Sequence, residues 1–346
     1  MKAYIKYKIN NIKVVMIIMS LLSIFYIAGI FSRMEFTNYI AGGTYFLNRI
    51  NIAKANMDIG LMICSFFLGI RTMQNVNDLC EKELPYKTTK RFANSFILGV
   101  LVILIQWIAV SVAATVFFFR YKDLFSEWNL TSKYYSELMK MDNLGNGLMF
   151  IASIYLCCLV IFSVTAVSTT IFKNYFAALL GTVGCFILPL FVVETIRKIG
   201  LHSFGKDMMY LNWLNKFNIF LSNYSQRNVG TTHINMAYIS VDNDMKYKCI
   251  IMAAMSILLY IFAVVLIKNV DGTSGKITLS LWIDRFLVVL FGILVSMILP
   301  YMYIFKKING IGLIFIMVFM AAVVTFIVNK LFGTSKKYEF LNARKN

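Results

Sequence analysis

The sequence predicts an all-α polytopic membrane protein. Charged residues make up only 14% of the 346-residue chain and hydrophobic residues 59%, whereas soluble domains contain about 25% charged residues. The charges cluster between long charge-free runs, several of which exceed the roughly 18 residues that a helix needs to cross a hydrocarbon core. These runs lack the alternating segments of about ten residues that a membrane β-barrel requires. Because backbone amides must be satisfied within lipid, helices are the expected structure.

The charge-free runs predict about eight membrane spans within a single transmembrane domain, residues 1–346. The expected spans are residues 14–31, 57–74, 96–119, 148–172, 175–193, 249–267, 286–305 and 308–329. The second has the shortest charge-free centre, because Asp58 and Arg71 lie at its ends. Pro189 and Pro300 fall inside spans and are expected to kink them.

The N-terminal residues 1–13 predict a basic amphipathic helix that precedes the first span. Apolar residues recur there near helical spacing, with Lys2, Lys6, Lys8 and Lys13 between them. Such a pattern is typical of a helix that lies on the inner membrane surface.

Two longer hydrophilic segments are expected on the outer side, residues 120–146 and the large outer loop 197–248. Apolar residues recur at helical spacing in both, which predicts amphipathic helices at the outer interface. The candidate substrate-contact residues are Trp128, Tyr210, Trp213 and Phe217. A lid that packs on the membrane surface would show the same pattern.

The net charge of +18 is explained by Lys and Arg that flank the spans and face anionic lipid headgroups. No soluble basic domain is present to hold nucleic acid, so nucleic acid is not an expected partner. The distribution of basic residues near the span ends predicts that both termini are cytoplasmic. The expected location is the plasma membrane of a bacterium.

Catalytic and nucleotide-binding motifs are not found in the sequence. Only two histidines occur, His202 and His233, and they do not form the paired pattern of a metalloprotease helix. The segment from Asp271 to Thr278 differs from a phosphate loop, which needs Gly in place of Val270 and Ser or Thr in place of Ile277. The chain is therefore not expected to carry a nucleotide site of its own.

A charged segment at residues 76–92 connects the second and third spans. In it, Glu83, Leu84 and Pro85 are followed by Lys87, Lys90 and Arg91. Together with the basic N-terminal helix, the large outer loop and the missing ATPase motifs, this pattern resembles the permease subunits of ABC exporters of the type-two class. The resemblance covers residues 1–267, and the last two spans are similar to the longer, eight-span permeases of some Gram-positive bacteria.

The resemblance implies that this chain is non-catalytic and works with a separate ABC ATPase subunit, which would hold ATP and Mg²⁺, and with a second permease chain. It also implies that residues 76–92 dock on the ATPase as a coupling loop, through Glu81, Lys82, Glu83, Leu84, Pro85, Lys87, Lys90 and Arg91. The expected substrate is an amphipathic peptide, antibiotic or lipid-like molecule.

Two other functions are compatible with the sequence. A membrane sensor or immunity protein would bind a peptide ligand at the outer loops without moving it. A membrane-embedded enzyme would need a polar cluster at one membrane face, for which Glu194, His202 and Asp207 are the best candidates.

Overall fold

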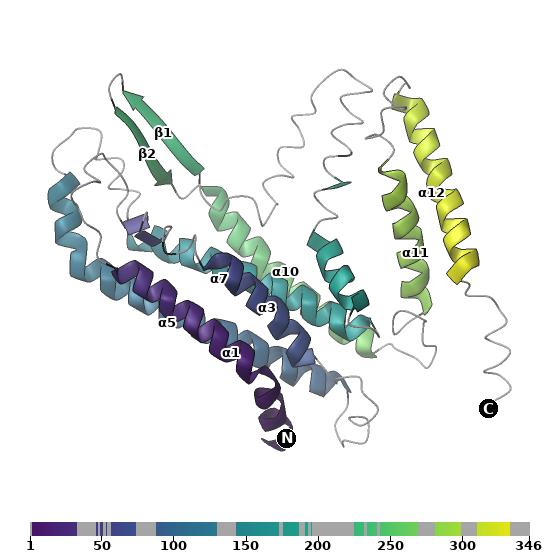
Figure 1. Ribbon diagram of the computed structural model, residues 1–346, viewed down its shortest axis with the longest axis horizontal. Helices are drawn as coiled ribbons and strands as arrows, with labels where there is room; N and C mark the ends of the chain where they lie inside the picture. Colours follow the sequence, from purple (N-terminus) through teal and green to yellow (C-terminus); the bar gives the residue numbers. More distant parts are fainter. Residues whose placement is uncertain are drawn as a thin grey trace. The chain divides into compact units, whose positions relative to one another are not determined.

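The computed structural model describes fifteen stretches of the chain. They are residues 2–32, 46–47, 49–50, 53, 57–73, 88–129, 143–172, 176–186, 191–192, 195, 225–231, 234–240, 243–268, 281–298 and 310–332. The chain divides into two compact units (Figure 1). Unit 1 comprises Met1–Thr170 and Lys216–Lys268, and unit 2 comprises Ile171–Asn215 and Asn269–Asn346.

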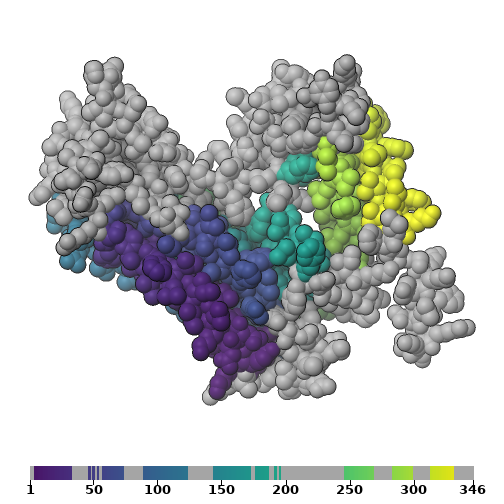
Figure 2. Space-filling model, in the orientation of Figure 1, coloured from purple at the N-terminus to yellow at the C-terminus, as the bar shows by residue number. Residues whose placement is uncertain are grey.

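Unit 1 is a bundle of antiparallel and parallel helices. Its helices are α1 (Lys2–Phe31), α3 (Asp58–Met73), α5 (Thr88–Asn129), α7 (Leu144–Ile171) and α10 (Asn243–Lys268). Helix α1 packs against α3 and α5, and α5 also contacts α10. Helices α1 and α3 lie side by side along one face of the unit (Figure 2).

Helix α7 lies in the core of unit 1, where every residue from Val160 to Thr170 is buried. Two glycines, one on α3 and one on α5, allow these helices to approach α7 closely. A Cβ atom on Gly69 of α3 would lie 2.7 Å from the Thr165 Cβ, and one on Gly99 of α5 would collide with the Phe162 ring. Small residues at such contacts are typical of helix packing in membranes.

Unit 2 contains a helix over residues 176–186 and the pair α11 (Leu281–Ser296) and α12 (Gly310–Phe332). Helices α11 and α12 pack along each other. Their close approach depends on Gly292, because a Cβ atom there would meet Thr325 Oγ1 and lie 2.8 Å from the Ala321 carbonyl oxygen.

Five described helices are long and apolar enough to cross a membrane. They are Tyr4–Phe31, Thr89–Asp123, Leu144–Ile171, Met245–Lys268 and Gly312–Lys330, which match the expected spans one, three, four, six and eight. The protein is therefore a polytopic, membrane-embedded helical protein. The other three expected spans fall on shorter helices, α3, residues 176–186 and α11, and their crossing of the membrane stays a prediction.

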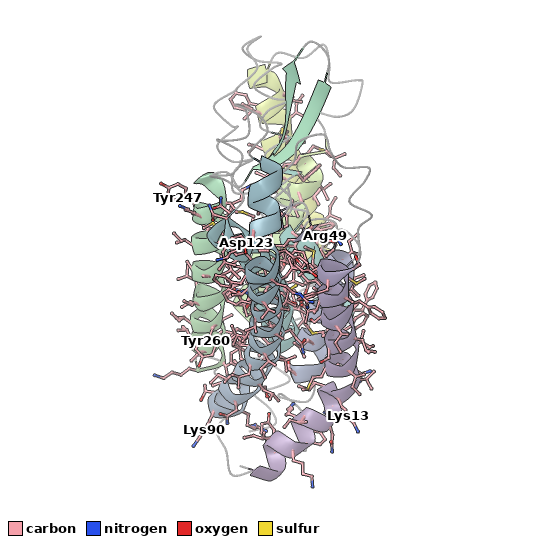
Figure 3. All side chains as sticks on the ribbon, turned by 90° about the vertical axis from the view of Figure 1, so that its left-hand side faces the viewer. Lys13, Arg49, Lys90, Asp123, Tyr247 and Tyr260 are labelled. Atoms are coloured by element: carbon pink, nitrogen blue, oxygen red, sulfur yellow. The ribbon has the colours of Figure 1, made fainter. Side chains whose placement is uncertain are left out.

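Residues 2–13 are helical as predicted, but they belong to the same helix as the first span, and their position on the inner membrane surface stays a prediction. Helix α1 runs without interruption from Lys2 to Phe31 and bends near Lys13 (Figure 3). Neither proline nor glycine occurs before Gly29, so nothing in the sequence stops the ladder of backbone hydrogen bonds. The buried positions Tyr4, Lys8 and Ile12 keep one stripe facing the bundle.

The third span is also longer than expected. Helix α5 has 42 residues and continues to Asn129, so the first ten residues of the expected outer segment 120–146 extend the spanning helix instead of forming a separate one. At 1.5 Å per residue α5 is about 63 Å long, roughly twice the thickness of a hydrocarbon core.

Among the described residues, one β-hairpin is not helical; it lies in the segment 197–248 that was expected to be the large outer loop, and it was not predicted from the sequence. Strand β1 (Ser225–Thr231) pairs antiparallel with β2 (Ile234–Ser240), with Thr231 opposite Ile234. The two residues between the strands match the shortest common hairpin connection. The amphipathic helix expected around Tyr210 lies outside the described residues.

The seventh span differs at its boundaries. Helix α11 begins at Leu281 and ends at Ser296, whereas the sequence predicted residues 286–305. The helix stops four residues before Pro300, in keeping with the preference of helices to end ahead of proline. The expected kinks at Pro189 and Pro300 lie outside the described residues.

Candidate functional site

Charged side chains mark the two ends of unit 1 (Figure 3). Lys13 and Lys90 lie at the proximal end, where α1 and α5 begin, and Arg49, Asp123 and Tyr247 lie at the distal end. Arg120 follows Arg91 by 29 residues along α5, which corresponds to a helix length of about 44 Å. This length matches the roughly 40–45 Å of a bilayer that includes its headgroups.

The proximal end contains a cluster that we call the basic junction, formed by Tyr4, Lys8, Arg91 and Ser95. The Tyr4 hydroxyl and the Ser95 hydroxyl are hydrogen-bonded at 3.0 Å, which joins α1 to α5. Lys8 lies one turn after Tyr4 on α1, and Arg91 lies one turn before Ser95 on α5. The junction therefore joins the first turns of two spanning helices.

Both cations of the basic junction are buried. Lys8 is 1% exposed and Arg91 is 3% exposed, although Lys and Arg side chains are almost never fully buried. The Lys8 ammonium lies 5.5 Å from the centre of the Tyr4 ring and 5.9 Å from that of Tyr7, within the range of a cation–π interaction. The electron-rich faces of these rings offset part of the cost of removing the ammonium from water.

Aromatic contacts connect the start of α5 to two more helices. The Phe92 ring stacks on Tyr260 of α10 at a centroid distance of 6.1 Å. Phe96 contacts Tyr260 at 5.1 Å and Phe162 of α7 at 5.2 Å. The first two turns of α5 are therefore packed against α1, α7 and α10 at the same time.

The structure describes two of the eight expected coupling residues. Lys90 is exposed and Arg91 is buried, so the two neighbours face opposite environments. The other six lie outside the described residues: Glu81, Lys82, Glu83, Leu84, Pro85 and Lys87. Burial of Arg91 follows from helix periodicity, because it shares a face with the buried Ser95 and Phe92 is buried beside it.

The expected outer residues are not brought together by described contacts. Trp128 belongs to the last turn of α5, but its side chain is outside the described set. Tyr210, Trp213 and Phe217, and the enzyme candidates Glu194, His202 and Asp207, also lie outside it. Within the described part of the chain, no three His, Cys, Asp or Glu side chains group together.

Sequence reasoning missed a buried segment at the distal end. Phe46, Leu47 and Ile50 are fully buried there, and Arg49 is 9% exposed. The Phe46 ring lies 5.0 Å from Phe118 of α5, and a Cβ atom on Gly147 of α7 would collide with it. The spacing of Phe46, Leu47, Ile50 and Ala53 is helical, and this signal could have predicted a packed segment.

Two hydrogen bonds between helices lie in the apolar zone between the ends. Gln106 Nε2 of α5 donates to Ser20 Oγ of α1 at 2.9 Å. The hydroxyls of Ser23 on α1 and Tyr155 on α7 are 3.2 Å apart. These bonds hold α1 to the bundle at mid-depth, as the basic junction does at the proximal end.

Comparison of the chain with protein-family models, curated proteins and solved structures gave no match.

Proposed function

We propose that this chain is the membrane-spanning permease subunit of an ATP-driven ABC exporter. In this proposal a separate ATPase subunit holds ATP and Mg²⁺, a second permease completes the pathway, and residues 76–92 receive the movement of the ATPase. The substrate would be an amphipathic peptide, antibiotic or lipid-like molecule that leaves the cell.

The packing of the basic junction is the main support for this proposal. Helix α5 begins at Thr88, within the charged segment 76–92, and its first turns are packed against three other helices through Ser95, Phe92 and Phe96. Because packed interiors transmit displacement instead of absorbing it, a push on this segment would move α1, α5, α7 and α10 together. That is the mechanical property that a coupling element needs.

The charge distribution supports a cytoplasmic proximal end. The charged side chains described there are all basic: Lys6, Lys8, Lys13, Arg71, Lys90, Arg91 and Lys268. The distal end combines basic residues with the acidic Asp58 and Asp123. An excess of Lys and Arg next to the spans is typical of the cytoplasmic side, where an ATPase would bind.

Co-purification tests the proposal directly. The chain is extracted from its native membrane in mild detergent, and the proteins that accompany it are identified. The proposal expects an ABC ATPase in stoichiometric amount, which is lost when residues 78–87 are scrambled. Scrambling residues 335–344 provides the control, because it also alters a charged segment and should leave the ATPase bound.

A second experiment separates coupling from binding. Replacing Glu83 and Pro85 with Ala should leave membrane insertion and ATPase binding intact, but abolish the stimulation of ATP hydrolysis by transported substrate. Normal transport by this double variant would show that residues 76–92 do not couple the two subunits. If no ATPase co-purifies from folded protein, the permease proposal is wrong, and a sensor or immunity function becomes the better explanation.

A further inference from the structure

Arg49 at the distal end of unit 1 is a charged side chain in an apolar setting. It is only 9% exposed and lies within the buried segment of Phe46, Leu47 and Ile50. Among the described residues, none forms a hydrogen bond, ion pair or ring contact with it. Since a guanidinium keeps its charge in proteins, its burial without an anion is costly.

Aromatic contacts lead from the segment that contains Arg49 to a second cation, Arg120. Phe46 lies one turn before Arg49 and stacks on Phe117 of α5 at 6.4 Å. Phe117 in turn contacts Tyr121 at 4.8 Å, and the Arg120 guanidinium lies 5.7 Å from the centre of the Tyr121 ring. A continuous chain of aromatic contacts therefore runs from the turn before Arg49 to Arg120.

The described acidic residues at this end, Asp58 and Asp123, do not pair with Arg49. Asp58 accepts a hydrogen bond from the Ile59 backbone N–H at 2.8 Å, and neither Asp58 nor Asp123 is paired with Arg49 among the described contacts. Burial lowers the pKa of Arg49 from its ordinary value, which indicates that its environment disfavours the charge. An anion from outside the chain would remove this cost.

The depth of Arg49 in the membrane determines which anions reach it. It lies at the level of Asp123 and Tyr247 (Figure 3), at the end of the apolar zone where the headgroups of a bilayer are located. Aromatic and basic side chains together at this depth are typical of a membrane interface. Phospholipid phosphates are therefore the anions that are always present beside this site.

The exposed apolar face of α5 is suited to the acyl chain of a phospholipid. Val112 and Val116 are 57% and 54% exposed, and Arg120 follows them at the same four-residue spacing, so all three share a face. An acyl chain that packs along Val112 and Val116 would bring its headgroup to Arg120.

We propose that Arg49 and Arg120 bind the phosphate of an anionic phospholipid at the distal end of unit 1. Guanidinium groups are suited to this role because their planar fork matches two phosphate oxygens at once. The lipid stabilises the contact of the segment around Phe46 with α5 and α7. This site is independent of the ATPase and of transport, and it is tested without either.

Lipid binding to the purified full-length chain tests the proposal. The melting temperature (Tm) is measured in a neutral detergent with added phosphatidylglycerol or phosphatidylcholine. We expect phosphatidylglycerol to raise the Tm of the natural chain, and Arg49→Gln to weaken this effect roughly tenfold in lipid concentration, as loss of a charge-assisted contact predicts. Arg120→Gln should weaken it less, because Arg120 is exposed.

Lys246→Gln is the matched control. Lys246 is exposed near the start of α10 at the same end, so its loss removes the same charge without touching the site. An equal response of Arg49→Gln and Lys246→Gln to phosphatidylglycerol would overturn the proposal.

Two further measurements keep the proposal testable if Arg49→Gln does not fold. Native mass spectrometry of the natural chain should show bound phosphatidylglycerol in preference to phosphatidylcholine, and equal retention of the two lipids would contradict an anionic site. Inorganic phosphate or glycerol phosphate should not reproduce the Tm shift. If either does, the site binds a free anion and the assignment to a lipid is wrong.

Discussion

Helices α7 and α10 are both apolar and similar in length, 28 and 26 residues, but they have opposite surroundings. Helix α7 is buried on nearly all sides, whereas α10 exposes large apolar side chains such as Ile250, Ile257 and Leu258. The central helix is rich in Ser and Thr, and these hydroxyls donate to their own backbone, as Thr165 does to the Ile161 carbonyl at 2.7 Å. Small side chains with satisfied hydroxyls permit close packing from several directions.

The glycines that face α7 offer the strongest test of this difference. Gly99→Ala would drive a methyl group into the buried Phe162 ring, and we expect a loss of about 2 kcal/mol or more in stability. Thermal melting in detergent measures it. Gly184→Ala is the control, because nothing lies within 4 Å of its Cβ position, and it should be neutral or stabilising. Equal melting of the two variants would contradict the packing described for α7.

Truncation of isoleucines compares the two helices directly. Ile154 of α7 is 1% exposed and Ile257 of α10 is 61% exposed. Ile154→Ala should cost about 2 kcal/mol, at the low end of the range for buried positions, because lipid is as apolar as the lost contacts. Ile257→Ala should cost under about 0.5 kcal/mol. A larger loss at Ile257 would indicate that α10 is covered by another protein chain instead of lipid.

A smaller effect than at Ile154 is expected for the hydrogen bond between Ser23 and Tyr155, which is 3.2 Å long. Tyr155→Phe and Ser23→Ala should each reduce stability by about 1 kcal/mol, and the double variant should lose less than the sum. A double-mutant cycle on melting curves gives the coupling energy, for which about 0.6 kcal/mol is typical in membranes. Strict additivity would show that the two hydroxyls do not interact. Tyr247→Phe, at a position that is 65% exposed, is the neutral control.

Much of the fold could be predicted from hydropathy alone. The five long spans were expected at nearly the observed positions, because a long charge-free run has few stable alternatives to a helix in lipid. The errors lie at the ends of elements. Residues 1–13 and 120–129 continue neighbouring helices, since amphipathic patterning does not indicate where a helix begins or ends.

The candidate site was predicted only in part. The sequence predicted that Lys90 and Arg91 belong to one basic group. In the structure Lys90 is exposed, whereas Arg91 is buried. The burial of Lys8 and of Arg49 was not predicted. Such positions depend on which neighbour each helix face meets, and that information is spread over residues far apart in the chain, such as Tyr4 and Ser95.

The sequence by itself determined that this is a helical membrane protein, where its long spans lie and that its charges gather between them. Only the tertiary structure decided that α7 is central and α10 peripheral, that the segment around Phe46 is packed into the distal end, and that Lys8 and Arg91 are buried together with Tyr4 and Ser95. The physical reason is that lipid and protein interior are similarly apolar. Hydropathy therefore indicates that a helix is in the membrane, but not which of its faces meets protein.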